Sequence, residues 1–430
     1  MITRNKYLNQ LMTFKDKDLI KVITGVRRCG KSTLLDMMRE YLAQSGVSRE
    51  RLLAFKMESM EYDGLDYRGL YNLVRQKTKG VDHPYLFFDE LQEIEGWERA
   101  INSLRVDIDC DIYLTGSNAY LLSSELSTLL SGRYVEVEML PLVFSEYLDF
   151  QGAKPASHAV AGVDLLELAD GSLATMDGML EQYRRFGGLP YLALGAPNID
   201  EHMAYCKSLY DTVVVRDILE RDKRRDRRSL TNPDLLERIC NFLADNIGNE
   251  NSINSITGVL KSQKLKVSND TVDAYIGALC EGYLFYPVKR FDIKGKEILK
   301  TGGKHYIVDS GLRNYLMGYR DLDQGRVFEN MVFQQLVYDG FSVSIGKLRN
   351  GEVDFVASRA DKKIYVQVTE DMSDSSTMER ELKPLRAIRD AYPKVVVVMR
   401  GNYPREIEGI RILGATDFLL HRRQLVCQLV

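Results

Sequence analysis

Hydrophobic and polar positions along the first 150 residues form short apolar runs separated by stretches with helical periodicity. Apolar runs of strand length lie at Ile20–Thr24, Leu52–Met57, Leu86–Phe88, Ile112–Thr115 and Val135–Val137. Strands that alternate with helices favour an α/β fold. We therefore expect residues 1–150 to form one α/β domain.

The pattern changes after residue 150. Gly, Ala, Pro and Ser are interspersed from Gly152 to Ser172, which indicates an insertion or a linker. From Met179 to Leu219 the apolar period is helical, and the turn Phe186–Pro190 interrupts it. The basic run Lys223–Arg228 that follows is either a solvated face or a phosphate-contacting patch. Residues 151–228 are thus expected to be a helical domain with an insertion.

Residues 229–304 have the pattern of a winged helix, in which three helices precede a two-stranded hairpin. The expected elements are helices at Pro233–Ala244, Ser255–Ser262 and Asp270–Glu281, the last capped by Asn269, and strands at Tyr283–Phe291 and Glu297–Thr301. Winged helices bind DNA, and they also serve as domain-packing or protein-binding modules. For nucleic acid, the candidate phosphate contacts are Lys264, Lys266, Lys289, Arg290, Lys294 and Lys296.

Residues 305–430 return to an α/β pattern. The expected helices are Phe328–Tyr338 and Met378–Tyr392, and the expected strands are Ser342–Gly346, Val353–Ala357, Ile364–Val368 and Val395–Met399.

A phosphate-binding loop follows the first apolar run. Residues 25–32 fit G-x-x-x-x-G-K-[ST] between a strand and a helix. Glycines let successive N–H groups point at phosphate oxygens, Lys31 would neutralise the β- and γ-phosphates, and Ser32 would bind Mg²⁺. Contacts to ATP are expected from Gly25, Val26, Arg27, Arg28, Cys29, Gly30, Lys31, Ser32 and Thr33.

Two acids end the run Tyr85–Phe88, whose continuous hydrophobicity is typical of a strand buried in a parallel sheet. Asp89 would hold Mg²⁺, and Glu90 would polarise the attacking water. Ser117 and Asn118, after the next strand, would orient water or sense phosphate loss, although Gly-Ser-Asn also favours an ordinary turn. The combination predicts hydrolysis of ATP with Mg²⁺.

A second constellation is similar to the PD-(D/E)xK nuclease core. Glu329 and Asp354 stand where such a core has metal-binding carboxylates, but Gln367 replaces its third acid and Thr369 replaces its lysine. An amide carries no charge to offset Mg²⁺, and threonine is neutral at pH 7. Cleavage is therefore expected to be lost, while the fold and a nucleic-acid-binding groove can persist.

Composition excludes several classes. The net charge of −3 is no global signature of nucleic-acid binding. The six cysteines include no C-x-x-C pair and no zinc spacing, which favours reduced thiols in a cytoplasmic protein. The amino terminus lacks the apolar region of a signal peptide, and no apolar run reaches membrane-spanning length.

Together these motifs resemble the AAA+-like P-loop ATPases of archaea and bacteria whose C-terminal half is a domain of unknown function with a degenerate nuclease-like fold. Besides residues 25–32, the resemblance is carried by residues 88–92 with Trp97, 114–117, 131–133, 187–190 and 351–355. It implies a P-loop ATPase core (1–150), a helical lid with an insertion (151–228), a winged helix (229–304) and a restriction-endonuclease-like α/β domain (305–430). It also implies that Arg133 is an arginine finger or sensor, where the alternative is a surface arginine, and that Pro190 lines the adenine site.

Three functional hypotheses follow. The first is an ATP-driven machine acting on DNA or RNA, and the second is a STAND-like signalling switch whose C-terminal domains bind a protein partner. The third, an ATP-coupled nuclease, is disfavoured by Gln367 and Thr369. A homo-oligomer is expected if Arg133 acts in trans.

Overall fold

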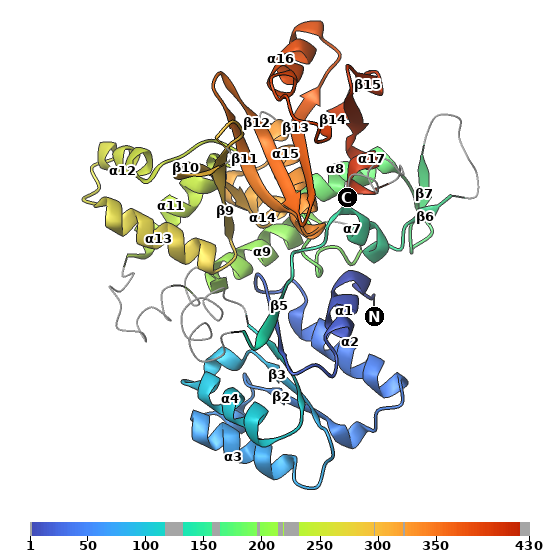
Figure 1. Cartoon of the computed structure of the whole chain (residues 1–430), viewed down its shortest axis with the longest axis vertical. Helices are drawn as coiled ribbons and strands as arrows, with labels where there is room; N and C mark the ends of the chain where they lie inside the picture. The colour runs from blue at the N-terminus through green and yellow to red at the C-terminus, as the bar shows by residue number, and fades with distance from the viewer. Residues whose placement is uncertain are drawn as a thin grey trace. The chain divides into compact units, whose positions relative to one another are not determined.

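The structure is a computed structural model that describes residues 2–116, 132–156, 164–195, 198–213, 218, 232–295, 297–320 and 323–421. The chain divides into two compact units (Figure 1). The first comprises Met1–Leu140 with Glu281–Tyr283, and the second comprises Pro141–Cys280 with Leu284–Val430. The first unit thus ends ten residues before the boundary expected at residue 150, because helix α7 (Phe144–Phe150) packs against α8 (Met176–Phe186) of the second unit.

The first unit contains a five-stranded parallel sheet with the strand order β2-β3-β4-β1-β5. Its strands are β1 (Ile20–Thr24), β2 (Leu52–Lys56), β3 (Tyr85–Asp89), β4 (Asp111–Thr115) and β5 (Tyr134–Glu138). Its helices are α1 (Asn5–Thr13), α2 (Lys31–Gln44), α3 (Tyr67–Lys77) and α4 (Trp97–Asp107), with short 3-10 turns at Arg49–Arg51, Met60–Tyr62 and Leu91–Glu93. The α/β fold with a parallel sheet is confirmed.

The core of this sheet explains the continuous apolar runs. Phe55, Leu86 and Leu114, from three neighbouring strands, are almost fully buried. They pack in one cluster with Leu70 of α3 and Ile101 of α4. Helices α3 and α4 therefore bury one apolar face of these strands, as expected for a parallel sheet.

The second unit begins with helices and a small sheet. The stretch 152–172, expected as an insertion or a linker, contributes strands to a three-stranded antiparallel sheet in the order β6-β7-β8, made of Lys154–Pro155, Leu165–Glu167 and Leu173–Thr175. The helical period after it forms α8 and α9 (Ile199–Tyr210), with a break after Phe186. Strands of two or three residues lack the long periodic pattern that marks an element in sequence.

Three helices then precede a hairpin: α11 (Pro233–Asp245), α12 (Ile253–Ser262), α13 (Asn269–Glu281), β9 (Phe285–Asp292) and β10 (Glu297–Ile307). The cap expected at Asn269 is wrong by one residue, because the Ser268 Oγ accepts the Thr271 N–H at 3.1 Å. The boundary expected at 304/305 is also wrong. It falls inside β10, and β9 pairs in parallel with β11, so the hairpin belongs to the sheet that follows.

That sheet has eight strands in the order β10-β9-β11-β12-β13-β14-β16-β15. The remaining strands are β11 (Ser342–Leu348), β12 (Gly351–Arg359), β13 (Lys362–Asp371), β14 (Lys394–Arg400), β15 (Glu406–Ile407) and β16 (Ile410–Gly414), and the helices are α14 (Ser310–Met317), α15 (Gln324–Tyr338), α16 (Ser375–Arg386) and α17 (Ala415–Leu419). Strands β11 to β13 form an antiparallel meander, and β14 extends it in parallel.

Helices cover both faces of this meander. Phe333 of α15 packs on Phe355, whereas Leu382 of α16 packs with Val356 and Tyr365. Since successive residues of a strand point to opposite faces, the contacts of Phe355 and Val356 place α15 and α16 on opposite sides of the sheet. Within the described part of the chain, none of the helices has the length and hydrophobicity needed to cross a bilayer.

Candidate functional site

The loop between β1 and α2 has the backbone geometry of a phosphate cradle. Gly25 has φ +130° and Gly30 has φ +104°, a region that residues with a side chain rarely adopt. A Cβ at Gly25 would lie 2.1 Å from the Met139 carbonyl oxygen. The Lys31 side chain is buried, and its Nζ donates to the carbonyl oxygens of Gly25 and Val26 at 3.0 Å each.

The other loop residues predicted to contact ATP differ from Lys31 in their contacts and burial. Arg27 forms an ion pair with Glu58 at 2.8 Å. Arg28 has φ +65°, and Thr33 is exposed on the first turn of α2. Cys29 is buried, and burial raises the pKa of its thiol. A buried, protonated thiol is a weak nucleophile, so Cys29 serves the loop by packing.

The carboxyl ends of β3 and β4 bring polar groups to the start of α2. The Ser32 Oγ donates to Asp89 Oδ1 at 2.9 Å, and the Thr115 Oγ1 donates to the same oxygen at 2.7 Å. A hydroxyl and a carboxylate side by side are the hard oxygen ligands that Mg²⁺ prefers. The donor set therefore fits a magnesium ion held by Ser32 and Asp89.

Glu90 follows in a left-handed conformation with φ +53°. Its backbone N–H donates to Thr115 Oγ1 at 2.9 Å, and its carboxylate accepts a hydrogen bond from the Gln92 side chain. A residue with a side chain in this region is unfavourable by about 1–3 kcal/mol, which surrounding contacts must offset. The strained turn aims Glu90 away from the direction of the strand that carries Asp89.

Thr115 was not among the residues predicted from sequence, although it is the last residue of a buried strand and polar. The predicted Ser117 and Asn118 lie outside the described residues. Arg4 was also missed. Its Nη1 donates to the Cys29 carbonyl at 3.1 Å and to the Leu140 carbonyl at 2.8 Å, so one buried guanidinium joins the loop to the residue that ends the first unit.

Arg133 lies at the opposite end of the sheet from the loop. It directly precedes β5, its carbonyl accepts the N–H of Ile20, and its Nη1 donates to Asn102 at 3.1 Å. Because β5 runs parallel to β1, Ile20 and Arg133 share the amino end, whereas the loop follows the carboxyl end. Arg133 thus lies away from the loop of its own chain, and its role as an arginine finger or sensor, in cis or in trans, stays a prediction.

The motif Gly187–Pro190 is held inside the second unit. The Gly188 N–H donates to Asp309 Oδ2 at 2.7 Å, and its carbonyl accepts the Leu142 N–H at 2.7 Å. Asp309 is fully buried, and burial raises its pKa to about 6. Contact between Pro190 and adenine stays a prediction.

Three of the four nuclease-like positions belong to one cluster of side chains, and the fourth, Thr369, lies near the end of a strand. Asp354 and Gln367 are adjacent, since the Asp354 N–H donates to Gln367 Oε1 at 3.3 Å. Glu329 joins Asp354 through Lys304, which forms ion pairs with both and was missed by the sequence analysis. Thr369 stands apart, with its Oγ1 donating to the Asp371 carbonyl at 3.2 Å.

The candidate nucleic-acid contacts are partly accessible. Lys264, Lys266, Lys289 and Lys294 are exposed. Arg290 has a side chain that is only 16% exposed and forms an ion pair with Glu250, and its contact with phosphate stays a prediction. Lys296 lies outside the described residues.

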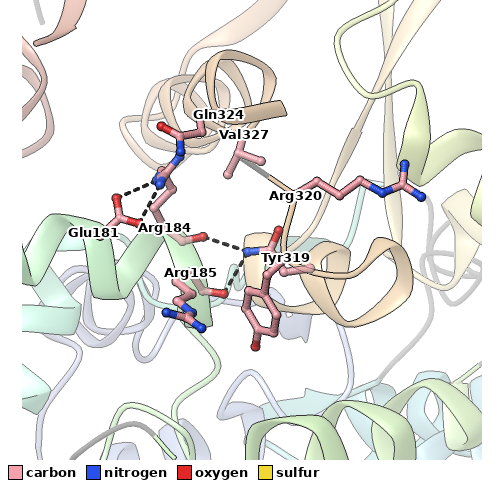
Figure 2. Close-up of a pocket in the computed structure, with 8 residues that line it drawn as sticks. Glu181, Arg184, Arg185, Tyr319, Arg320, Gln324 and Val327 are labelled. Carbon is pink, nitrogen blue, oxygen red and sulfur yellow. Dashed lines mark hydrogen bonds and ion pairs between the residues drawn. The ribbon is translucent and has the colours of Figure 1, made fainter. Parts of the chain in front are cut away.

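A cavity of about 330 Å³ lies among α8, α14 and α15 (Figure 2). Arg184 of its wall pairs with Glu181 at 2.6 Å, and Arg320 pairs with Asp245 at 3.0 Å. The Arg185 guanidinium lies 4.8 Å from the centre of the Tyr319 ring. Since carboxylates balance two of these three guanidiniums, the cavity has little excess charge to attract an anion.

Comparison with known proteins decides the family. Residues 17–148 match the family described as an AAA domain, and residues 178–323 match a domain of unknown function. A protein of Haemophilus influenzae is 37% identical over 422 residues, covering 98% of this chain and 99% of the relative. The chain belongs to the same family as this relative.

A second relative, from Methanocaldococcus jannaschii, is 30% identical over 380 residues, covering 86% of this chain and 79% of the relative. Both relatives are described as uncharacterized. Among solved structures, a Walker-type ATPase of Pyrococcus abyssi is 14% identical, with a TM-score of 0.47 over 74% of this chain and 96% of that one. ORC1 of Aeropyrum pernix in complex with DNA is 12% identical, with a TM-score of 0.28 over 74% and 92%. The membership makes the first unit a P-loop domain of nucleotide-binding type.

Proposed function

We propose that the protein hydrolyses ATP with Mg²⁺ in its first unit. The observation that carries the proposal is the convergence of the Ser32 and Thr115 hydroxyls on Asp89 Oδ1, at 2.9 and 2.7 Å, beside the loop that holds Lys31. A glycine turn formed by chance would not be expected to lie beside the Ser32 hydroxyl, the strand-end acid Asp89 and the second acid Glu90. The same arrangement supports separate roles for these residues in nucleotide binding and in catalysis.

The roles follow from the chemistry of each group. Backbone N–H groups of the loop and Lys31 bind the phosphates, and Ser32 and Asp89 hold the Mg²⁺, which would neutralise charge that develops on the phosphate oxygens. Glu90 accepts a proton from the water that attacks the γ-phosphorus while the bond to the β,γ-bridging oxygen breaks. ADP and inorganic phosphate are the products.

Two substitutions test this proposal. Lys31→Ala is expected to abolish ATP binding, because the phosphates lose their main neutralising charge. Glu90→Gln is expected to keep binding but lower kcat by about 100-fold or more, because an amide cannot accept the proton. The measurements are nucleotide binding by calorimetry and phosphate release, with Glu95→Gln, an exposed neighbour, as the control. Turnover at the parent rate by Glu90→Gln would show that Glu90 is not the base.

We further propose that the second unit provides a surface for nucleic acid. The order of α11, α12, α13 and the β9–β10 hairpin supports a winged helix, and four exposed lysines lie on the turn before α13 and on the hairpin. Glu329 lies on the helix α15, Asp354 lies on β12, and Gln367 lies on the neighbouring strand β13. This placement supports a nuclease-like core that does not cleave nucleic acid. The rival proposal is a signalling switch that binds a protein partner, and a homo-oligomer is required if Arg133 acts in trans.

A further inference from the structure

Lys304 lies at the centre of a carboxylate cluster in the second unit. Its side chain is 5% exposed, and its Nζ is 2.8 Å from Glu352, 3.2 Å from Glu329 and 3.8 Å from Asp354. The three acids come from α15 and β12, whereas Lys304 comes from β10. One ammonium therefore faces three carboxylates that separate elements bring together.

The charges of this cluster are strongly coupled. Burial acts to lower the pKa of Lys304, but Glu329, Asp354 and Glu352 outweigh it and raise the pKa above its usual value. Burial, together with the charge of Glu329, raises the pKa of Asp354. The buried ammonium, within 3.8 Å of all three acids, is thus placed to offset their charge.

Other contacts hold the carboxylates around Lys304. The Tyr306 hydroxyl donates to Glu329 Oε1 at 2.6 Å, and the Val368 N–H donates to Asp354 Oδ2 at 2.8 Å. On the far side of Glu329, a Cβ at Gly248 would lie 3.2 Å from either carboxylate oxygen. These contacts therefore hold Glu329 and Asp354 in place beside the buried ammonium.

We infer that the Lys304 ammonium is the permanent cation of this cluster and stands where a nuclease-like centre would hold a divalent metal ion. A Mg²⁺ ion in such a centre would lie among these carboxylates, with oxygens at about 2.0–2.1 Å. The Lys304 ammonium lies within 3.8 Å of all three acids and supplies the positive charge at that place. A lysine that activates water would stand beside the metal ion, whereas Lys304 contacts all three acids itself. The centre consequently neither binds a divalent cation nor cleaves a phosphodiester.

This inference deepens the proposal of a non-cleaving nuclease-like core, and ATP hydrolysis by the first unit plays no part in it. Its test uses the full chain with Asp89→Asn, which removes the metal ligand of the P-loop site. Adding Lys304→Met takes away the ammonium and keeps the length of the side chain. We expect this double variant to bind Mn²⁺ about tenfold or more tightly than Asp89→Asn alone, because three carboxylates are left without a cation.

Electron paramagnetic resonance of free Mn²⁺ measures the binding, and thermal unfolding provides a second readout. Mn²⁺ should raise the Tm of the Lys304→Met double variant and leave that of Asp89→Asn unchanged. Adding Asp354→Asn should abolish the gain, and Lys304→Arg, which keeps the charge, should not show it. A correctly folded Lys304→Met double variant without any gain would overturn the inference.

The Asp89→Asn protein with Lys304 in place gives an independent test, even if Lys304→Met does not fold. We expect that Glu329→Gln and Glu352→Gln do not weaken the binding of Mn²⁺ to this protein, because the cluster binds none. We also expect no nicking of supercoiled DNA in the presence of Mn²⁺. Either activity, if sensitive to Glu329→Gln, would show that Lys304 accompanies a metal ion rather than replacing it. Loss of ATPase activity in Glu90→Gln would affect neither outcome.

Discussion

At the residue scale, Thr115 connects the two acids that follow β3. Its hydroxyl donates to Asp89 and accepts the backbone N–H of Glu90, so one side chain sets the position of the metal-binding acid and of the proposed base. The left-handed conformation of Glu90 depends on such a contact, because the backbone gains nothing from this region by itself.

Thr115→Val is therefore expected to lower kcat for ATP by about 10- to 100-fold while KM changes little, since small misplacements of reacting groups are costly. Steady-state phosphate release measures both constants. Thr115→Ser keeps the hydroxyl and should restore most of the rate, which a purely space-filling role would not predict. A parent-like kcat in Thr115→Val would rule out the positioning role.

At the scale of elements, Asp309 ties the turn after α8 to the start of α14. Its Oδ2 accepts the Gly188 N–H, and its Oδ1 accepts the Leu312 N–H at 2.9 Å as the cap of α14. A Cβ at Gly187 would lie 2.2 Å from Asp309 Oδ1. The glycines of this motif thus permit close contact with a buried carboxyl, a role within the second unit.

The pH dependence of stability tests this buried carboxyl. Burial raises the pKa of Asp309 from 3.8 to about 6, so the folded state binds a proton more tightly than the unfolded state. The sign follows from linkage: the contribution of Asp309 is fully present below pH 3.8 and is lost as the pH rises through about 6. The loss is on the order of 3 kcal/mol.

Asp309→Asn cannot ionise, so its free energy of unfolding should lack this fall between about pH 4 and pH 6. Denaturant unfolding of both proteins across that range measures the difference. Asp374→Asn is the matched control, because Asp374 caps α16 but is exposed, and its Ser376 hydrogen bond lowers its pKa. An unchanged slope in Asp309→Asn would mean that the carboxyl is ionised in the folded protein throughout this range.

At the scale of the whole molecule, the central question is whether the second unit senses nucleic acid for the first. The overall charge of −3 predicts few phosphate contacts and modest affinity. Lys289 and Lys294 are exposed on the hairpin. Unlike Arg290, whose partner is Glu250, neither has an ion pair in the described structure.

Replacing Lys289 and Lys294 with Glu should weaken binding to all sequences alike, because phosphate contacts carry no sequence information. If each lysine contacts one phosphate, the log–log salt slope should become shallower by about 1.8. Fluorescence anisotropy on duplex, single-stranded and branched DNA measures this, with Lys79→Glu and Lys383→Glu as a control of equal charge change. ATP turnover raised by DNA would favour the DNA-acting hypothesis, and no binding at low salt would favour the protein-partner switch.

Local sequence determined the nucleotide site to a large extent. The strands β1 to β5 and the loop at 25–32 were predictable because a buried parallel strand and a glycine loop each leave their signal within a few consecutive residues. The strands of the small three-stranded sheet were not, since two or three residues carry no periodicity. The hairpin β9–β10 was predicted as an element, but its pairing with β11 was not.

Only the tertiary structure decided the contacts between residues that are far apart in the chain. Arg4 reaches Leu140 across 136 residues. Lys304 reaches Glu352 across the domain boundary that the sequence predicted at 304/305, which falls inside β10. The sequence showed that Thr369 replaces the lysine of a nuclease core. It did not show that a cation from another strand, Lys304 of β10, lies among the acids. Charge neutralisation depends on distance in space, and a pattern along the chain records only distance in sequence.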